Sequence, residues 1–348
     1  MIALIGATGF TGSLVARELV RRGVPAIWIA RSAERMDALA KDLAVDVERR
    51  VASPTDAEGL TRALAGCTVV IDTVGPFTDL GEPVVKAAIA LGAHYIDTTG
   101  EQGFMRAMLD RHDAAAKAAN VAVICACAYE YALGECVATL AAAEMDGSSD
   151  VDVYYLVMGG SVSHGTAKSA LHVAGEGGVR LENGVLVPEH LASGTVAVPG
   201  YDQPRTVVSV PGGEALHLAR HTRVRSVRSW MGVPPAMTRW LFASPLLGAL
   251  ALGPVRRLVD HLVDTRVREP SASQREAARF IVLARARSGA REVTRRVDGR
   301  DPYATTAALT VEAATRLLAA PPKAIGVTSA AAAFDPVGFL AGVGLTAS

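Results

Sequence analysis

The sequence lacks an excess of charge of either sign. Its 348 residues include 35 Lys and Arg and 35 Asp and Glu, so the formal net charge is zero. A protein that binds nucleic acid needs a basic surface to neutralise phosphates, and we therefore expect no nucleic-acid partner. Half of the residues are hydrophobic and a fifth are charged. This composition predicts an ordinary globular chain that is long enough for two domains.

Cysteine is also scarce. Cys67, Cys125, Cys127 and Cys136 do not follow the spacing of a disulfide framework or a zinc ribbon. Cys125 and Cys127 would lie on the same face of a strand, as small buried residues. We therefore expect free thiols in a reducing compartment and no metal site.

Long hydrophobic runs are missing as well. The uncharged stretch 240–255 contains Pro245 and is shorter than the roughly 20 residues that span a bilayer. The first predicted strand begins at Met1, which leaves no room for a targeting segment before it. Together these observations predict a cytoplasmic protein.

The first 130 residues show a regular alternation of strands and helices. Short apolar runs that fit buried parallel strands alternate with segments of helical period. The predicted strands are 1–5, 26–30, 45–52, 68–75, 93–100 and 121–128. This pattern predicts the α/β class, with a Rossmann-type doubly wound parallel sheet over residues 1–130.

The pattern changes after residue 130. Alternating apolar and polar residues predict a second α+β domain with a mostly antiparallel sheet over 131–303, including a hairpin turn at Asn183-Gly184. Residues 304–348 are expected to be helical and to pack back on the first domain.

The segment GATGFTG at 6–12 lies between the first predicted strand and a helix that ends near Gly23. Three glycines in this context are typical of a phosphate-binding turn. Gly6 permits a tight turn, Gly9 lets the backbone approach a pyrophosphate, and Gly12 lets the helix pack closely on the strand. The amides and the positive dipole end at the helix start attract an anion. The segment therefore predicts a dinucleotide cofactor.

The end of the second predicted strand indicates which dinucleotide is bound. Sites for NAD usually carry Asp or Glu there to bond the ribose 2′-hydroxyl, whereas arginine suits a 2′-phosphate. This chain has Arg31 and Ser32 at that place. A guanidinium matches the geometry of a phosphate. We therefore expect NADP(H).

Several motifs together resemble those of the saccharopine dehydrogenase-like oxidoreductases, especially the branch that includes trans-acting enoyl reductases. They are GATGFTG at 6–12, VGPF at 74–77, GAHYIDTTGE at 92–101, SVSHGTAKSAL at 161–171, DPYATTAALTVEAATRLL at 301–318 and GVTSAAAAF at 326–334. The resemblance extends over nearly the whole chain. It implies a Rossmann domain, a mixed α/β domain over 131–303 that binds substrate and forms the dimer, an NADP(H)-dependent redox reaction and a homodimer.

The resemblance also implies the cofactor-binding residues. Those for the pyrophosphate are Gly6, Thr8, Gly9, Phe10, Thr11 and Gly12; those for the adenosine phosphate are Arg31 and Ser32; those on the nicotinamide ribose side are Val74, Gly75, Pro76 and Phe77. In open parallel sheets the ligand lies at the carboxyl ends of the strands. Near the nicotinamide we therefore expect Thr98, Thr99, Gly100 and Glu101 after the fifth strand, and Tyr129 and Glu130 after the sixth.

The chain departs from the family pattern at AYEYALGE, residues 128–135, and at SHGT, residues 163–166, where the family usually has SGGT. Reduction of an enone or an imine needs a proton donor in addition to a hydride. The candidate donors are Tyr129, Glu130, Tyr131, His164 and Lys168. For each of them a role in packing, capping or solvation is the alternative interpretation.

Two further stretches leave alternatives open. Residues 230–263 are strongly apolar and are interpreted as core or dimer packing, as the wall of an acyl-chain channel, or as a contact with a membrane surface or a carrier protein. His217 and His221 are four residues apart in HLARH, without a glutamate after the first histidine. A solvent-exposed helix face is favoured there over a zinc site.

The sequence therefore predicts an NADPH-dependent reductase. Its proposed substrate is an activated C=C bond in a hydrophobic, acyl-type molecule, with a carrier-bound enoyl thioester as one form. Reduction of a C=N bond, as in saccharopine-type enzymes, is the first alternative. A non-catalytic NADP-binding sensor is the second, because it would keep the glycine turn and lose the chemistry of residues 128–135.

Overall fold

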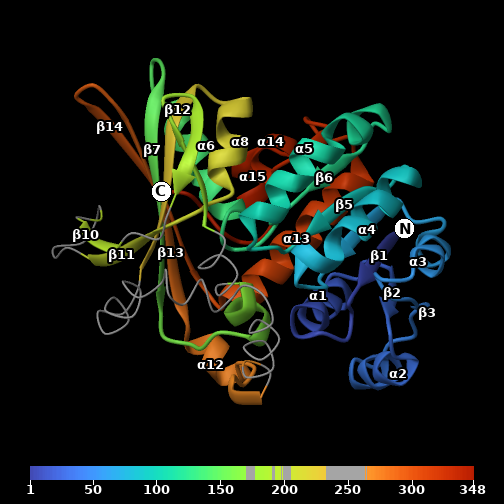
Figure 1. The fold of residues 1–348 in the computed structure, drawn as a ribbon. Coiled ribbons are helices and arrows are strands. Elements are labelled where there is room, and N and C mark those ends of the chain that lie inside the picture. Colours follow the sequence, from blue (N-terminus) through green and yellow to red (C-terminus); the bar gives the residue numbers. More distant parts are fainter. Residues whose placement is uncertain (170–176, 190–192, 197, 199–204, 233–262, 264) are drawn as a thin grey trace. The chain divides into compact units, whose positions relative to one another are not determined.

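The computed structural model describes residues 1–169, 177–189, 193–196, 198, 205–232, 263 and 265–348. The chain forms two compact units, and each of them consists of three stretches. The first unit comprises Met1–Thr99, Phe104–Ala132 and Tyr303–Val343; the second comprises Gly100–Gly103, Leu133–Pro302 and Gly344–Ser348. Each unit has a sheet of its own (Figure 1).

The first unit is built on a seven-stranded parallel sheet with the order β15-β6-β5-β4-β1-β2-β3. Its strands are β1 (Ile2–Ile5), β2 (Ala26–Ala30), β3 (Arg49–Val51), β4 (Val69–Asp72), β5 (His94–Asp97), β6 (Ala122–Ile124) and β15 (Gly326–Thr328). The chain proceeds in opposite directions on the two sides of β1. This reversal is the switch point of a doubly wound sheet, so the predicted Rossmann-type fold is confirmed.

Helices connect these strands. They are α1 (Phe10–Arg21), α2 (Ala33–Asp42), α3 (Ala57–Leu64), α4 (Phe77–Ala90) and α5 (Gln102–Ala118), followed near the end of the chain by α13 (Pro302–Ala319), α14 (Ala330–Ala333) and α15 (Pro336–Ala341). Helix α1 ends as its sequence predicts. Gly23 adopts a φ of 64°, its N–H donates to the Val20 carbonyl, and the Val24 N–H donates to the Leu19 carbonyl. This paired arrangement is a common glycine-terminated helix end.

Helix α13 is tied to α1 by an ion pair. The Arg22 guanidinium lies 2.7 Å from Glu312, and Glu312 also accepts from Arg316 at 2.7 Å.

Residues 326–344 were expected to be helical only, and that expectation is wrong for Gly326–Thr328. This strand is buried and pairs in parallel with β6, because the open edge of β6 satisfies its backbone better than a three-residue helix would.

The second unit contains a mixed sheet in which most pairings are antiparallel. Its main path is β10-β11-β12-β7-β13-β14; β8 pairs with β12 and β9, and only β12 and β7 are parallel among the described pairs. The strands are β7 (Ser149–Met158), β8 (Gly178–Glu182), β9 (Val185–Glu189), β10 (Ser193–Val196), β11 (Arg205–Val210), β12 (Val224–Gly232), β13 (Arg279–Ser288) and β14 (Arg291–Arg300). Helices α6 (Ala132–Ala143), α8 (Glu214–His221) and α12 (Ala272–Ala277) accompany them.

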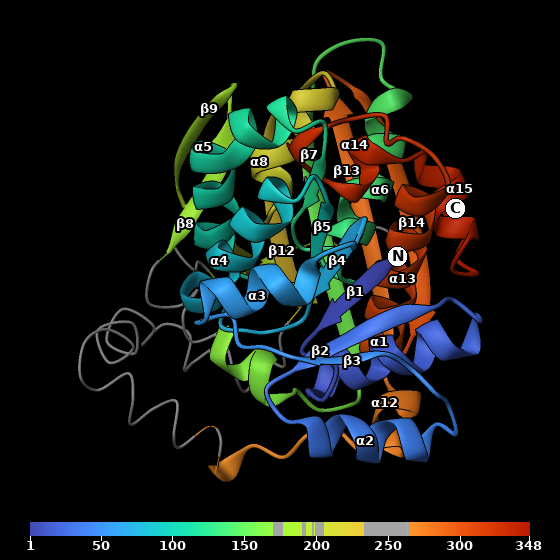
Figure 2. The same cartoon turned by 90° about the vertical axis from the view of Figure 1, so that its right-hand side faces the viewer.

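Two hairpins shape this sheet. The predicted turn at Asn183-Gly184 joins β8 to β9, and both residues have positive φ, 50° and 81°. The longer hairpin joins β13 to β14 and continues the antiparallel pairing of β7 with β13 (Figure 2). Both turns have the glycine that a left-handed backbone favours.

The two faces of the second sheet differ. One face carries an apolar cluster of Tyr154, Leu156, Val198, Val207, Ile281 and Leu283, with Trp230 packed against it. The next residue along β7, Tyr155, points to the other face, where its phenol bonds the Glu214 carboxyl of α8. Ser229 also donates to Glu214 at 3.0 Å. Burial raises the pKa of Glu214 to about 7.

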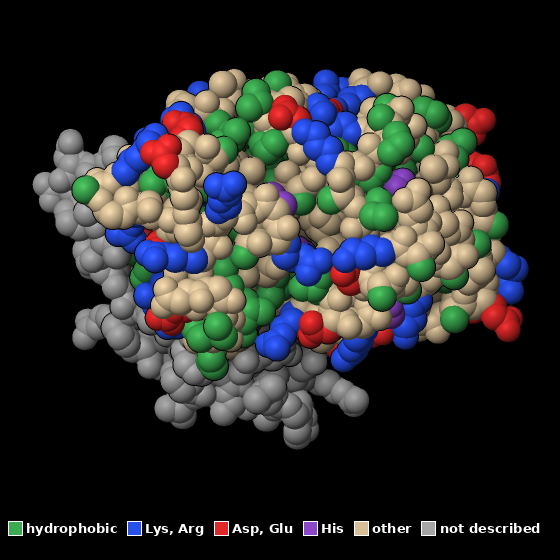
Figure 3. Space-filling model, turned by 90° about the horizontal axis from the view of Figure 1, so that it is seen from above, with side chains coloured by type: hydrophobic (Ala, Val, Ile, Leu, Met, Phe, Trp, Pro, Cys, Tyr) green, Lys and Arg blue, Asp and Glu red, His purple; other side chains and the backbone are tan. Residues whose placement is uncertain are grey.

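Charged side chains of both signs are interspersed on the surface seen in Figure 3. Many of the arginines form ion pairs, for example Arg225 with Asp150 at 2.8 Å and Arg17 with Asp42. Exposed pairs of this kind contribute little to stability. The absence of net charge follows from the equal numbers of basic and acidic residues, 35 of each.

Candidate functional site

The glycine turn at 6–12 is closely packed against the strands around it. Gly6 has a φ of 81°, and the Gly9 N–H donates to the Gly6 carbonyl at 2.8 Å. A Cβ on Gly12 would collide with that same carbonyl oxygen, and a Cβ on Gly6 would come within 2.7 Å of Thr73 and Val74. Gly9 is exposed and extended, and a Cβ there would meet only the Gly6 oxygen, at 3.2 Å. The geometry thus agrees with the tight turn predicted at Gly6 and the close packing predicted at Gly12, whereas the approach of a pyrophosphate at Gly9 stays a prediction.

The start of α1 has the properties of an anion site. Its N-cap is Gly9, which has no side chain to accept from the free amides, and its first turn contains no acidic residue. By contrast α2 and α3 are capped by Ser32 and Asp56, and each has a glutamate in its first turn. A bound phosphate would satisfy the amides of α1 as those side chains satisfy α2 and α3. Thr8 and Thr11 in this turn are half-buried.

The residues expected at the adenosine phosphate lie beside this turn. Arg31 is exposed directly after β2, and Ser32 caps α2 by accepting from the Arg35 N–H at 3.2 Å. The Arg35 guanidinium donates to the Thr8 carbonyl at 2.8 Å. Arg35 was not predicted as a site residue. Its position three residues after the cap, in RSAER, is the signal that would have indicated it, because residues three apart share a helix face.

The loop after β4 is held against the glycine turn. Thr73 Oγ1 donates to the Ile5 carbonyl at 2.8 Å, and the Val74 N–H donates to Asp72 at 2.9 Å. Gly75 is exposed and Pro76 precedes α4. Phe77 is buried, with its ring 5.9 Å from that of Phe104. Of the residues expected on the nicotinamide ribose side, Phe77 thus contributes to the core.

The loop after β5 is divided between the two units. Thr98 is half-buried and Thr99 is buried in the first unit, whereas Gly100 and Glu101 belong to the second. Glu101 is 3% exposed and accepts a hydrogen bond from Ser169 at 3.2 Å. Glu101 is therefore partnered within the second unit, with the helical residues that follow SHGT.

The proposed proton donors form two groups. Tyr129 and Glu130 follow β6 in the first unit, and the Tyr129 phenol bonds the Glu130 carboxylate. Burial, together with that carboxylate, raises the pKa of Tyr129 well above its usual value. The Tyr129 N–H donates to Thr306 of α13 at 3.1 Å. Tyr131 is buried beside them with a φ of 44°.

His164 and Lys168 lie in the second unit on a helical segment, residues 164–169. His164 Nδ1 is 2.9 Å from the Glu269 carboxylate, and Nε2 contacts the Val267 carbonyl. Both ring nitrogens therefore face oxygen acceptors, so His164 holds residues 267–269 against the helix. Lys168 is half-buried.

The remaining site predictions can be placed only in part. Of the apolar stretch 230–263, Trp230–Gly232 end β12 and Val263 is buried, whereas 233–262 lie outside the described residues.

His217 is 2% exposed in α8, so the interpretation of HLARH as a solvent-exposed helix face is wrong for that residue. It packs inward with Glu214 because α8 lies against β12. Among the described residues no cluster of ligands suits a metal ion.

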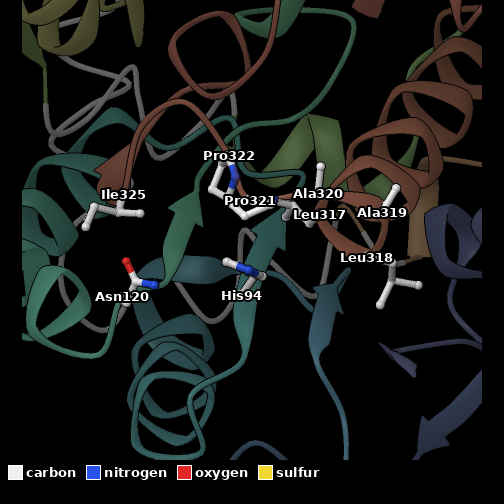
Figure 4. A pocket seen from close by; sticks show the side chains of 9 residues that line it. All are labelled: His94, Asn120, Leu317, Leu318, Ala319, Ala320, Pro321, Pro322 and Ile325. Atoms are coloured by element: carbon white, nitrogen blue, oxygen red, sulfur yellow. The ribbon is translucent and has the colours of Figure 1, made fainter.

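A cavity of about 340 Å³ lies at the opposite edge of the first sheet (Figure 4). It is lined by His94, Asn120, Leu317, Leu318, Ala319, Ala320, Pro321, Pro322 and Ile325. His94 begins β5 and Asn120 precedes β6, so this cavity is at the amino ends of the strands. The glycine turn is at their carboxyl ends, and the cavity is therefore not the predicted nucleotide site.

No helix in the described part of the chain has both the length and the apolar character needed to cross a membrane. Residues 2–124 match the family described as saccharopine dehydrogenase NADP binding domain. They include the glycine turn, the arginines after β2 and the loops after β4 and β5.

Similar proteins in mycobacteria carry the name trans-acting enoyl reductase. One from Mycobacterium tuberculosis is 35% identical over 182 residues, which are 49% of this chain and 43% of that protein. One from Mycobacterium leprae is 37% identical over 134 residues, 37% of this chain and 32% of that protein. The matches thus span less than half the length of these relatives.

A solved structure matches the fold of the whole chain. Apo saccharopine dehydrogenase (L-Glu forming) from Saccharomyces cerevisiae aligns with a TM-score of 0.65 at 14% identity, covering 100% of this chain and 98% of the other. At that identity the match shows the fold alone. The comparisons therefore show that residues 2–124 match the saccharopine dehydrogenase NADP binding domain and that the chain has the fold of saccharopine dehydrogenase.

Proposed function

We propose that the chain is an NADP(H)-dependent reductase that acts on the activated C=C bond of a hydrophobic enoyl thioester held by a carrier. The observation that carries the proposal is the start of α1. It combines an uncapped helix end, a turn with no room for a side chain at Gly6 or Gly12, and Arg31 at the strand end where NAD sites have an acid, with Arg35 in the helix turn that follows. These features fit a dinucleotide with a 2′-phosphate.

The residues of this chain have separate tasks in the reaction. The amides of α1 would hold the pyrophosphate, and Arg31 and Arg35 would hold the 2′-phosphate. When bound, NADPH supplies the hydride, which adds to the β-carbon of the enoyl group. The protein must then deliver a proton to the α-carbon, and the first unit offers Tyr129 for that step.

Tyr129 is suited to hold a proton until the substrate needs it. Its raised pKa keeps the phenol protonated throughout the neutral range. Release of the proton becomes favourable only as negative charge develops on the thioester enolate. Glu130 accepts a hydrogen bond from the phenol and orients it, so we propose Tyr129 as the donor and Glu130 as the positioning group.

The proposed partners follow from the names of the relatives and from the composition. The name trans-acting enoyl reductase, given to the relatives, supports an enoyl substrate that is presented by another protein. We propose that this other protein is an acyl carrier. A homodimer, a cytoplasmic location and a contact through residues 230–263 stay predictions. Light scattering of the purified chain tests the first of them.

The test begins with binding and proceeds to turnover. Purified protein is titrated with NADPH and with NADH while nicotinamide fluorescence is followed, and the titration is repeated with Arg31→Ala. In the unaltered protein we expect NADPH to bind at least tenfold more tightly than NADH. In Arg31→Ala we expect this preference to be lost. Absence of binding to either nucleotide would overturn the proposal.

Turnover then separates the alternatives. NADPH consumption is measured with enoyl thioesters on a carrier, with the same chains free in solution, and with imines formed from amino acids. We expect consumption with the enoyl thioester and its loss in Tyr129→Phe. Turnover of imines alone would favour a C=N reductase, and binding without turnover of any substrate would favour a sensor.

A further inference from the structure

Two buried aspartates lie side by side at the carboxyl ends of β4 and β5. Asp72 and Asp97 are paired in the register of the two strands, and both are 0% exposed. Each begins the same four-residue pattern, DTVG at 72–75 and DTTG at 97–100. The Asp72 carboxylate accepts from the N–H of Val74 at 2.9 Å. The Asp97 carboxylate accepts in the same way from Thr99, at 3.0 Å.

The groups around the two carboxyls are Tyr95 and Cys125. The Tyr95 hydroxyl donates to Asp72 at 3.3 Å. Tyr95 and Cys125 also lie close to the Asp97 carboxyl, whose Oδ2 is buried and accepts no hydrogen bond from the described residues. Burial raises the pKa of Asp97 to about 6 and that of Asp72 well above its usual value; the charge of Asp97 raises the latter further. Among the described residues no Lys, Arg or His forms an ion pair with either carboxyl.

Two adjacent carboxylates without a cation cannot both remain ionised in a dry site. The hydrogen bonds indicate which of them keeps its charge. Asp97 accepts from two backbone amides, those of Thr99 and Ala126 (2.7 Å), whereas Asp72 accepts from one. Backbone amides stabilise the charged form of a carboxyl group. The proton of the pair therefore belongs on Asp72 and the negative charge on Asp97.

We propose that Asp97 is a buried anion that tunes the cofactor: it strengthens the binding of NADP⁺ relative to NADPH, while Asp72 stays protonated. This inference rests on the proposed cofactor function. The nicotinamide ring is cationic in NADP⁺ and neutral in NADPH, so a fixed negative charge at this edge of the sheet favours the oxidised form. Loss of hydride from NADPH is thereby made easier. Asp97 also anchors the loop that leads to Tyr129, through Ala126.

The experiment measures the ratio of the dissociation constants of NADP⁺ and NADPH. Asp97→Asn removes the charge and keeps an oxygen that accepts from the amides, and Asp72→Asn imitates the neutral carboxyl already present. We expect Asp97→Asn to weaken the preference for NADP⁺ at least threefold, and Asp72→Asn to change the ratio less than twofold. An unchanged ratio in Asp97→Asn, or the larger effect in Asp72→Asn, would overturn the inference.

A second measurement needs no variant. In the unaltered protein the ratio is followed from pH 7.5 down to pH 5, with fresh NADPH at each pH, a range chosen to bracket the Asp97 pKa of about 6. As the pH falls through that value Asp97 gains a proton, so the preference for NADP⁺ should decrease. The 2′-phosphate titrates in the same range, but it is common to both nucleotides and cancels from the ratio. A ratio independent of pH would contradict the inference and leave the proposed function intact. Failure to bind either nucleotide would overturn both.

Discussion

The two units both bury acidic side chains, but in different places and with different partners. In the first unit Asp72 and Asp97 lie at strand ends, where their oxygens fix the loops that face a nucleotide. In the second, Glu214 is the first residue of helix α8 and accepts hydrogen bonds from Tyr155 and Ser229 of the sheet. Burial and a raised pKa are common to both, so neither property by itself marks a functional group. Position at the carboxyl edge of a parallel sheet is what distinguishes the first unit.

The largest expected effect concerns the glycine turn. Gly12→Ala places a methyl group on the Gly6 carbonyl oxygen, so we expect loss of NADPH binding by more than 100-fold and destabilisation by about 3 kcal/mol or more. Nicotinamide fluorescence and urea unfolding followed by circular dichroism measure the two effects.

Gly9→Ala is the matched control for Gly12→Ala. Its methyl group has more room, 3.2 Å from the Gly6 oxygen, but lies on the side where the pyrophosphate would approach. We expect nearly normal stability with weakened NADPH binding. Normal NADPH binding in Gly9→Ala would show that the turn has only a structural role.

The corresponding change in the second unit should affect stability without affecting binding. In Gly134→Ala a methyl group would collide with the Tyr155 hydroxyl and lie 2.6 Å from Glu214, and we expect a loss of about 2–3 kcal/mol in the free energy of unfolding. NADPH affinity should stay within twofold. Gly165→Ala changes another helical glycine, where a Cβ would make only an ordinary contact with Ser163 Oγ at 3.8 Å, and it should not destabilise the chain. If Gly134→Ala lowered the NADPH affinity together with the stability, the prediction that the second unit does not contribute to NADPH binding would be contradicted.

Glu214 should also make stability depend on pH. Its folded-state pKa of about 7 lies above the unfolded value near 4.5, so the folded state binds the extra proton between those values. This contribution therefore favours folding at low pH and is lost as the pH rises through 7, by ~3 kcal/mol at most. Urea unfolding at pH 5 and pH 8 measures it. Glu214→Gln should remove that part of the pH dependence, and an identical profile for the two proteins would refute the assignment.

The smallest predicted effect concerns Arg35. Its guanidinium donates to the Thr8 carbonyl and lies beside the expected 2′-phosphate. We expect Arg35→Ala to reduce the preference for NADPH over NADH about tenfold, close to 1.4 kcal/mol, with little change in NADH affinity. Arg17→Ala, in an exposed pair on α1, is the control. An equal loss for both nucleotides would mean that Arg35 acts only by holding the turn.

Much of the first unit, and one hairpin of the second, could be predicted because their signals are local. The glycine turn and the stop at Gly23 in the first unit, and the hairpin at Asn183-Gly184 in the second, each depend on backbone conformations that glycine or asparagine favours. The strands β1, β2 and β4 to β6 could be predicted for a different reason. Both of their faces are buried, so their sequences are apolar runs.

What could not be predicted depends on neighbours that are distant in the sequence. The strand β15 is three residues long inside an alanine-rich segment, and only the edge of β6 makes it a strand. His217 resembles a surface histidine until α8 is placed on β12. The pairing of Asp72 with Asp97 is a matter of strand register, which repeats such as DTVG and DTTG suggest but do not determine.

The position of β15 has a consequence for how the protein is made. The strand completes the sheet beside β6, yet the ribosome synthesises the longest stretch of the second unit, Leu133–Pro302, between the two strands. Helix α13, which the Arg22–Glu312 pair joins to α1, also emerges only after that stretch. During synthesis the nucleotide-binding unit therefore exists for a long period with an unpaired edge at β6. Completion of the first unit has to wait for the chain to return from the second.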